Sequence, residues 1–529
     1  MQPSALTSHL RGILEHQGQG LVDREQTLAL SLLAALAGHN VLLLGPPGTA
    51  KSLLARRLSG AFADATRFEY LLTRFTTPDE LFGPVSLRAL KERDALERNT
   101  QGYLPAAQVV FLDEIFKAGS AILNALLTLL NERIFFNGGK AEPAQLLVLV
   151  AASNEVPQGG ELQALYDRFP LRLLVEPVRG EAAFEALLTA STEPAPLPVG
   201  SRLRVADLQV LRDARDQVGL SAGAFAVLSR LRERLGEGSP ADWERRYVSD
   251  RRWRQILALL KTSAGAHGAH EVQEADCGLL RHMLWNDPQD AAAIGELVDS
   301  VLQERGMDAD LDAGPVGVRW KQLLGQLALH DSALAPRVQA WVLRVGDRER
   351  RYSPQELSAA QQNPWDHVLR SEGLYWDGQA FKQLQRSGKR GWVLGDWACS
   401  SQEIWDKVLG HQEPVFDETV RTELVPELGE GAVVDLSQIP GPTRTRWLGE
   451  LGVIHGTLEA QEQQRRARLN ALEAQLDEHL FLRQDDVAGL RLGLERAGVE
   501  IETWRERLAE LEQALMEGGR WVTSALPDT

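Results

Sequence analysis

The sequence predicts an α/β core built on a parallel sheet, followed by helical domains and a smaller β-containing module. Three short apolar runs, "VLLLG" from residue 41, "VVFLDE" from 109 and "LLVLVAASN" from 146, alternate with helical patterns between about 1 and 180. Runs that are apolar on both faces are typical of parallel strands covered by helices. At 529 residues the chain is too long for one compact core, so we expect several domains.

The core is assigned to residues 1–190, and a helical domain to 203–303, after the Pro-rich stretch "TEPAPLPVGSRLRV". The clearest helix of the second domain is "YVSDRRWRQILALLKTSA", which Asp250 is expected to cap. Its apolar residues recur at helical spacing. They are Trp253, Ile256, Leu257 and Leu260.

Residues 335–440 predict a compact β-containing module, because short strand-like pieces such as "GWVLGDW" are broken by Gly, Pro and Asp. Six tryptophans lie there, and without basic flanks they favour core packing over a base-stacking platform. They are Trp341, Trp365, Trp376, Trp392, Trp397 and Trp405.

The remaining segments, 305–334 and 441–529, are predicted to form one discontinuous helical domain. Leucines spaced three or four apart among Glu and Arg indicate a helical hairpin or coiled-coil arm, interrupted near "FLRQDDVAG". Helices packed against their own chain would explain the pattern equally well. The leucines are Leu469, Leu472, Leu476, Leu480, Leu508, Leu511 and Leu515.

Composition excludes several classes of function. The chain is 44% hydrophobic and 25% charged, with a formal net charge of −16, which opposes broad contact with nucleic acid or anionic membrane. Cys277 and Cys399 lie in no metal-binding or disulfide spacing, so we expect two reduced thiols. No secretory signal is recognisable in "MQPSALTSHLRGILEHQG", and "LALSLLAALAG" is too short to span a bilayer, so we expect a cytoplasmic protein without a transmembrane segment.

The stretch "VLLLGPPGTAKSLLARRL" has the strand–loop–helix context of a phosphate-binding loop. Gly45 and Gly48 allow the bend, Lys51 would reach the β- and γ-phosphates, and the Ser52 hydroxyl would ligate Mg²⁺. Ala50 stands where the usual pattern has its last glycine. Since a Cβ is costly only at positive φ, and alanine is the best helix former, we predict a helical φ at Ala50.

Two further strand ends supply the groups that hydrolysis requires. In "VVFLDE", Asp113 can hold the Mg²⁺ shell and Glu114 can polarise the attacking water. Asn154, at the end of "LLVLVAASN", can orient that water or the γ-phosphate without adding charge. The three motifs together predict hydrolysis of a nucleoside triphosphate with Mg²⁺.

Phosphoryl transfer also needs positive charge at the γ-phosphate, which an arginine of a neighbouring subunit can supply. The candidates are Arg168 in "YDRF" and Arg133 in "NERIF". In "YVSDRRW", either Arg251 or Arg252 could approach the phosphates from the helical domain. Residue types alone leave both choices open.

With these motifs, the chain resembles the MoxR group of AAA+ ATPases and, within it, the lysine-decarboxylase-associated branch called regulatory ATPase variant A. The resemblance covers most of residues 20–260. Its carrying stretches are "GLVDREQ", "LLLGPPGTAKSLLARRL", "FEYLLTRFTTPDELFGP", "GYLPAAQVVFLDEIFKAG", "ILNALLTLLNER", "LLVLVAASNEVP", "LQALYDRF" and "YVSDRRW". In the C-terminal half, the likeness is limited to the order of elements and a loose similarity around "LFLRQDDVAGLRLGLERAGVEIETW".

The resemblance implies a hexameric ring with ATP bound between an α/β AAA+ core and an α-helical lid. It further implies a partner protein with a von Willebrand factor A domain, and more weakly a lysine decarboxylase-like client. By motif match, Asn154 is sensor 1, Arg168 the arginine finger, Arg251 sensor 2 and Val22 an adenine contact. The implied Walker A nucleotide-binding residues are Gly45, Pro46, Pro47, Gly48, Thr49, Ala50, Lys51, Ser52 and Leu53, and the Walker B pair is Asp113 and Glu114.

Three functional hypotheses follow from these observations. The first is a chaperone-like remodelling ring, in which ATP hydrolysis at subunit interfaces acts on a partner protein. The second is an ATP-gated scaffold with negligible turnover, although Glu114 argues against it because a pure binder needs no such base. The third, a motor subunit of a metal-chelatase-like complex, has no support in the C-terminal half.

Overall fold

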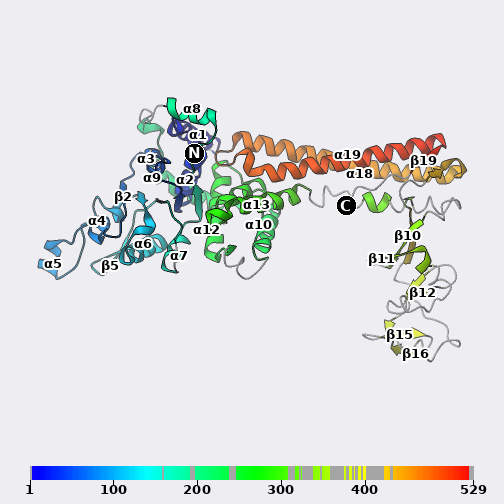
Figure 1. Ribbon diagram of the computed structural model, residues 1–529, viewed down its shortest axis with the longest axis horizontal. Coiled ribbons are helices and arrows are strands. Elements are labelled where there is room, and N and C mark those ends of the chain that lie inside the picture. Colours follow the sequence, from blue (N-terminus) through cyan, green and yellow to red (C-terminus); the bar gives the residue numbers. More distant parts are fainter. Residues whose placement is uncertain are drawn as a thin grey trace. The chain divides into compact units, whose positions relative to one another are not determined.

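The computed structural model describes residues 3–157, 160–190, 197–237, 246–307, 316–320, 323–324, 338–345, 348–357, 374–376, 381–383, 386–387, 391–394, 397–400, 422–428 and 433–522. The chain forms two compact units. The first contains residues 1–307 and 468–495, and the second contains residues 308–467 and 496–529. Figure 1 shows the elements of both units in sequence colours.

The core of the first unit is a five-stranded parallel sheet with strand order β2-β3-β6-β1-β7. The three apolar runs of the sequence form its three central strands, and every residue of β1 and β6 is buried. The predicted parallel α/β core is therefore confirmed. The strands are β1 (Val41–Leu44), β2 (Arg67–Leu71), β3 (Val109–Asp113), β6 (Val148–Ser153) and β7 (Leu171–Leu174).

Eight helices and a β-hairpin precede, separate or follow the strands of this sheet along the described part of the chain. Residues Leu28 to Ala37 of α2 are all buried, so this helix lies inside the unit rather than at its surface. The helices are α1 (Pro3–Gly18), α2 (Glu25–Ala37), α3 (Lys51–Gly60), α4 (Pro78–Phe82), α5 (Leu87–Arg93), α6 (Ser120–Glu132), α7 (Gly160–Tyr166) and α8 (Glu181–Thr189). The hairpin pairs β4 (Ile134–Asn137) with β5 (Lys140–Pro143).

A helical lid follows, as the sequence predicts. Its longest helix starts at Asp250, but the cap is Ser249, whose Oγ accepts the N–H of Arg252 at 3.2 Å. The expected capping by Asp250 is therefore wrong by one residue, because only the residue that precedes the first turn can accept an N–H of that turn. The lid contains α9 (Val205–Asp216), α10 (Ala222–Leu235), α12 (Asp250–Ala266), the 3-10 segment η4 (Ala275–His282) and α13 (Ala291–Gly306), with the two-stranded pair β8 (Gly219–Leu220) and β9 (Glu271–Val272).

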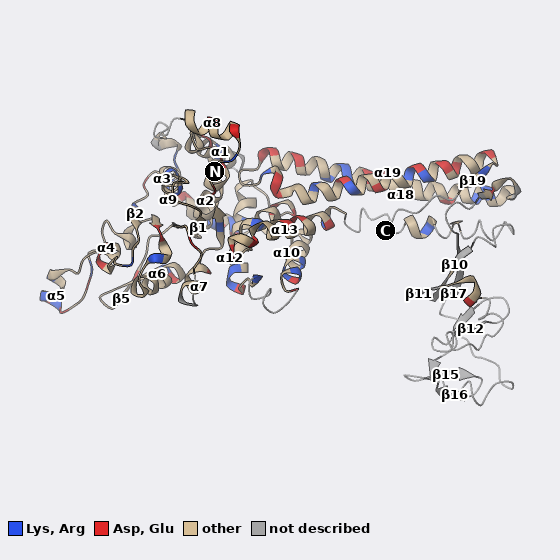
Figure 2. Ribbon diagram, in the orientation of Figure 1, with Lys and Arg blue, Asp and Glu red and all other residues tan. Residues whose placement is uncertain are grey.

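Two long helices, α18 (Gly441–Glu478) and α19 (Ala488–Glu517), form the predicted C-terminal helical region, with the interruption between them at the expected place. Lys and Arg alternate with Asp and Glu along both helices (Figure 2). The turn between them belongs to the first unit, together with the adjoining ends of the two helices. Glycines allow that contact: a Cβ at Gly489 would lie 2.1 Å from the carbonyl oxygen of Asp299, and one at Gly493 would lie 2.3 Å from that of Gln303.

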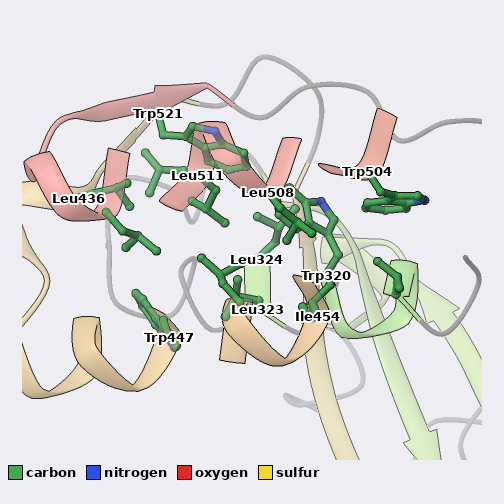
Figure 3. Packing of buried hydrophobic residues seen from close by; sticks show 14 of the residues in the cluster. Trp320, Leu323, Leu324, Leu436, Trp447, Ile454, Trp504, Leu508, Leu511 and Trp521 are labelled. Atoms are coloured by element: carbon green, nitrogen blue, oxygen red, sulfur yellow. The ribbon is translucent and has the colours of Figure 1, made fainter. Parts of the chain in front are cut away.

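The second unit has an apolar core rich in tryptophan (Figure 3). Trp320 packs edge-to-face against Trp504 and Trp521, with ring centroids 5.9 and 5.8 Å apart. Trp447 of α18 and Leu508 of α19 are fully buried in the same cluster. These tryptophans lie outside the 335–440 stretch and are core residues.

The predicted β-containing module is built of short antiparallel strands where the structure describes it. A three-stranded sheet has the order β11-β10-β17, and a second has the order β14-β15-β16. Trp341, Trp376, Trp392 and Trp397 lie on strands, whereas Trp365 and Trp405 lie outside the described residues. The strands are β10 (Val338–Val345), β11 (Arg348–Tyr352), β12 (Leu374–Trp376), β13 (Phe381–Gln383), β14 (Arg386–Ser387), β15 (Gly391–Leu394), β16 (Trp397–Ser400), β17 (Thr422–Leu428) and β18 (Val433–Asp435), the last paired with β19 (Arg520–Val522).

Among the helices in the described part of the chain, none combines the length and apolarity that crossing a bilayer would require. The predicted domain boundaries stay predictions, although the contacts group residues 468–495 with the first unit rather than with the rest of 441–529.

Candidate nucleotide site

The loop after β1 lies where a parallel sheet places its ligands, outside the carboxyl ends of the strands. Gly45 is required there, because a Cβ would lie 2.2 Å from the carbonyl oxygen of Val175. Gly48 has a left-handed φ of 82°, and a Cβ on it would meet nothing within 4 Å. The loop therefore passes close to the backbone at Gly45 and is open at its tip, where Pro46, Pro47 and Gly48 are exposed.

Ala50 has φ 69° and ψ 22°, so the helical conformation predicted for it is wrong. The residue is the N-cap of α3 rather than its first helical residue, and a cap residue need not have helical angles. A left-handed backbone costs a residue with a Cβ roughly 1–2 kcal/mol. The Ala50 carbonyl nevertheless accepts the first helical hydrogen bond, from Leu54 N–H at 3.0 Å.

The loop is fixed from both sides by side-chain contacts. Thr49 Oγ1 donates to the Pro46 carbonyl at 2.9 Å, and the buried Arg24 donates from Nε to the Thr49 carbonyl at 3.2 Å. Arg24 also donates to the carbonyls of Asp23 and Glu176. The predicted adenine contact, Val22, is half-buried in the turn just before Arg24. Sequence reasoning missed Arg24, because its partners lie 25 and 152 residues away.

Lys51 is the first residue of α3 and points back over the loop. Its Nζ donates to the carbonyls of Gly45 at 2.7 Å and Pro46 at 2.8 Å. Burial lowers the pKa of Lys51, while the carboxylates of Asp113 and Glu114 oppose that shift. An ammonium that neighbouring carboxylates keep charged is suited to phosphate. Ser52 and Leu53, both half-buried, follow it on α3.

Asp113 ends β3, and Glu114 follows in a left-handed conformation with φ 53° and ψ 45°. The Glu114 N–H donates to Asp113 Oδ1 at 3.0 Å. Glu114 Oε2 is buried and makes no hydrogen bond to the described residues, although Lys117 Nζ lies 3.3 Å away. Backbone strain combined with a buried oxygen that makes no hydrogen bond is typical of functional positions, and this carboxylate oxygen can accept a proton from water.

Asn154 follows β6, which lies between β3 and β1 in the sheet. The preceding Ser153 is buried; its carbonyl accepts the Gly45 N–H at 3.1 Å, and its Oγ donates to the Glu155 carbonyl at 2.8 Å. Asn154 itself is exposed. Because three adjacent parallel strands end at one edge, the loop, the two carboxylates and Asn154 share that edge.

This edge fits a nucleoside triphosphate with Mg²⁺. The open space at Gly48 has room for phosphate, and Lys51 Nζ contacts the same loop. In the described part of the chain, no three His, Cys, Asp or Glu side chains form a metal cage. Ser52 and Asp113 would hold Mg²⁺ jointly with phosphate oxygens, which is how proteins commonly bind this ion.

Arg168 lies at the opposite edge of the sheet. Its carbonyl accepts Asn40 Nδ2 at 3.3 Å, and Asn40 directly precedes β1, whereas the phosphate-binding loop follows β1. A strand of four residues spans about 13 Å. The Arg168 guanidinium contacts Asp167 at 3.2 Å, and its Nε has no hydrogen-bond partner among the described residues.

Arg251 is on the same side as Arg168. Ser249, the cap of α12, donates to both carboxylate oxygens of Asp167 at 3.0 and 3.1 Å, which ties the start of α12 to the residue before Arg168. Burial lowers the pKa of Arg168, and the charge of Arg251 lowers it further. Arg251 is exposed and contacts Asn131 Oδ1 at 3.4 Å. The structure thus brings Arg168 and Arg251 together, away from Lys51 of the same chain.

The two alternative arginines have buried structural contacts instead. Arg252 is 1% exposed and donates to Asn286 Oδ1 at 2.6 Å and to the Trp285 carbonyl at 2.9 Å. Arg133 donates to the Gly38 carbonyl at 2.8 Å, and burial, assisted by Arg212, lowers its pKa to about 10. Sequence reasoning also missed Asp167 and Ser249, because only the fold brings these residues together.

The fold and this edge define a nucleotide-binding α/β protein with a helical lid. Residues 8–212 match the family described as "MoxR domain in the MoxR-vWA-beta-propeller ternary systems", and residues 224–298 match the AAA lid domain. The chain belongs to the MoxR family of AAA+ ATPases.

Relatives of this chain include two uncharacterized proteins of Methanocaldococcus jannaschii. MJ0079 is 36% identical over 301 residues, which are 57% of this chain and 76% of that protein. MJ0812 is 37% identical over 281 residues, which are 53% of this chain and 72% of that protein. Competence protein ComM of Haemophilus influenzae is 30% identical over 159 residues, covering 26% of this chain and 31% of that protein.

Proposed function

We propose that this chain hydrolyses ATP to ADP and phosphate at the interfaces of a homo-hexameric ring, and that turnover drives chaperone-like remodelling of a partner protein. The observation that carries the proposal is the separation of Arg168 and Arg251 from the phosphate-binding loop. At the edge that holds Lys51, Asp113, Glu114 and Asn154, neither Arg168 nor Arg251 of the same chain is in place to contact the γ-phosphate. A neighbouring copy can supply that cation from its opposite edge.

The residues of one chain have distinct tasks in this proposal. Lys51 and the loop N–H groups hold the phosphates, and Ser52 and Asp113 hold Mg²⁺, which neutralises phosphate charge when bound. Glu114 takes a proton from the attacking water, while Asn154 orients that water. Arg168 of the neighbour stabilises the negative charge that develops on the transferred group.

The partner is proposed to carry a von Willebrand factor A domain, since the matching family is described from systems that pair a MoxR domain with such a domain. Kinship to regulatory ATPase variant A and a lysine decarboxylase-like client stay predictions that derive from the resemblance in sequence. A cytoplasmic location is likewise a prediction.

A subunit-mixing experiment tests the ring. Arg168→Ala and Lys51→Ala are each expected to lose activity about a thousandfold or more when alone, because one lacks the cation and the other cannot hold phosphate. In an equal mixture, a Lys51→Ala subunit supplies its intact Arg168 to the nucleotide site of a neighbouring Arg168→Ala subunit. Random mixing should restore about a quarter of the wild-type phosphate release, since half of the subunits bind ATP and half of these have a competent neighbour.

The matched control mixes Arg168→Ala with the double variant Lys51→Ala/Arg168→Ala. Because neither subunit has Arg168, this mixture should stay inactive. Wild-type phosphate release per subunit should also rise with protein concentration. Hydrolysis by a strict monomer with unchanged activity in Arg168→Ala would overturn the ring. Equal phosphate release by the wild type and Glu114→Gln would instead favour the ATP-gated scaffold.

A further inference from the structure

A cavity of about 690 Å³ opens beside the residues that precede β1, on the same side of the core as Arg168. It lies between His39 and the first turns of α12. Arg251 and Arg254, three residues apart and both exposed, share one face of that helix. The lining residues are His39, Asp250, Arg251, Arg254 and Gln255.

Two lining side chains have buried polar atoms that no described group satisfies. His39 Nε2 and Gln255 Oε1 are both shielded from solvent and have no hydrogen-bond partner in the described ranges. Burial, reinforced by the charges of Arg133, Arg215 and Arg212, lowers the pKa of His39 to about 3. The ring is therefore neutral at physiological pH, and its Nε2 can donate to an anion when it carries the proton.

The surroundings of the cavity are strongly cationic. Arg133, Arg212 and Arg215 donate to the carbonyls of Gly38, Leu36 and Ala37, at the carboxyl end of α2, and Arg215 also forms an ion pair with Asp216 at 2.7 Å. Arg254 has no ion-pair or hydrogen-bond partner among the residues that the structure describes. The lining itself combines Arg251 and Arg254 with one carboxylate, that of Asp250, and so carries a net positive charge. In a chain of net charge −16, such a concave surface indicates an anionic ligand.

We propose that this cavity is a phosphate site, in which Arg254 and His39 contact the triphosphate of a nucleotide held by the phosphate-binding loop of a second copy of the chain. The inference rests on the proposed ring and extends it. Arg168 and Arg251 border the same side of the core, so the phosphate that they reach lies next to the cavity. Arg254 is one helical turn farther along α12 and supplies a donor that the motifs of the sequence do not include.

The test is Arg254→Ala, with Arg232→Ala on α10 as the matched control, since Arg232 is also an exposed lid arginine. Arg254→Ala should lower the rate of ATP hydrolysis roughly ten- to hundredfold, the effect of removing one hydrogen bond to a charged group. Binding of Mg·ADP to dilute protein should be unchanged, because Arg254 acts on another subunit's nucleotide. The control should keep the wild-type rate.

Mixing identifies the subunit that Arg254 serves. Adding Lys51→Ala subunits, which carry an intact cavity, should restore part of the hydrolysis lost in Arg254→Ala, whereas Lys51→Ala/Arg254→Ala subunits should not. A wild-type rate in Arg254→Ala overturns the proposal, and so does a loss that mixing cannot rescue.

Added inorganic phosphate shows whether the cavity binds the phosphates of a second copy's nucleotide or free phosphate. If millimolar phosphate changes the wild-type rate but not that of Arg254→Ala, and mixing gives no rescue, the cavity binds free phosphate and the assignment to a second copy is wrong. The ring is tested independently by the Arg168→Ala mixture. If the Arg168→Ala mixture regains activity while Arg254→Ala is fully active, the ring stands and only the cavity site is rejected. If the Arg168→Ala mixture regains no activity, the ring itself is rejected.

Discussion

Ala50 and Glu114 both have a left-handed backbone, and both lie at the edge of the sheet that is proposed to bind the nucleotide. Such strain in residues other than glycine persists where surrounding contacts fix the chain, and at Ala50 the anchors are Thr49, Arg24 and the start of α3. Helix propensity led to the wrong conformation for Ala50. Propensity describes helix interiors, whereas this residue is a cap.

Ala50→Gly should therefore not destabilise the protein. Relief of roughly 1–2 kcal/mol of left-handed strain is offset by about 0.4–1 kcal/mol of added entropy in the unfolded chain, for a net gain of about 0–1.6 kcal/mol. Ala50→Val should lose stability, because a β-branched residue is poorly tolerated at positive φ. Urea unfolding monitored through loss of nucleotide binding measures both variants. Destabilisation by Ala50→Gly of more than about 1 kcal/mol would contradict the left-handed cap.

At the scale of elements, the turn between α18 and α19 binds the lid through two stacked histidines. The rings of His267 and His479 are 4.0 Å apart, and His267 Nε2 accepts the Leu480 N–H at 2.9 Å. His267 Nδ1 lies 2.7 Å from the Ser263 carbonyl, so it is the nitrogen that carries the proton. Protonation of Nε2 would break the contact to Leu480. A long helical arm is thereby attached to the lid by a contact that requires neutral imidazole.

Stability should fall as pH falls below about 6.5. Burial first, and His479 second, lower the pKa of His267 to about 3, against an ordinary 6.5. Between these values the unfolded chain binds a proton that the folded chain does not, so stability rises with pH across the window. Each such histidine should cost about 1.4 kcal/mol per pH unit below 6.5, and His39, also near 3, contributes equally.

The measurement is the free energy of unfolding of the first unit between pH 7 and 5. His267→Asn should have about half of the wild-type slope in that range, because one of the two histidines whose pKa is lowered to about 3 is gone. His270→Asn is the control, since His270 is exposed. A slope that His267→Asn leaves intact would show that the buried ring is protonated in the folded state.

At the scale of the whole molecule, short sequence patterns predicted the features that depend on neighbouring residues, namely the strands and the residues at their ends. The apolar runs ending in Gly45, Asp113 and Asn154 indicated a parallel sheet with one functional edge, because strand type and strand end can be read over six or so residues. The assignments left open were those that depend on distant contacts. Arg252 and Arg251 are adjacent in sequence, yet the loop around Asn286 buries one and leaves the other exposed.

The tryptophans illustrate the same limit. Their abundance in 335–440 drew attention to that module, whereas the described tryptophan core combines Trp320, Trp447, Trp504 and Trp521 from segments up to 201 residues apart. No spacing rule connects residues so distant. Hydrophobic periodicity predicted that α19 would be buried along one side, but its partners could be identified only from the fold.

The division into two compact units predicts two separable unfolding transitions. The nucleotide site lies entirely in the first unit, and the tryptophan cluster lies entirely in the second. Mg·ADP at a hundred times its dissociation constant should stabilise the first transition by about 2.7 kcal/mol and leave the second unchanged. Lys51→Ala should abolish that shift.

Leu508→Ala provides the reciprocal change. Leu508 is fully buried in the tryptophan cluster, so its truncation should cost the second transition about 2–5 kcal/mol. Tryptophan fluorescence reports that transition once Trp243, Trp253 and Trp285 of the first unit are replaced by Phe, and the loss of bound fluorescent nucleotide reports the first. Because α18 and α19 run from one unit into the other, the alternative is a single cooperative transition. In that case Mg·ADP and Leu508→Ala would each shift both signals together, and the long helices would couple nucleotide binding to the tryptophan core.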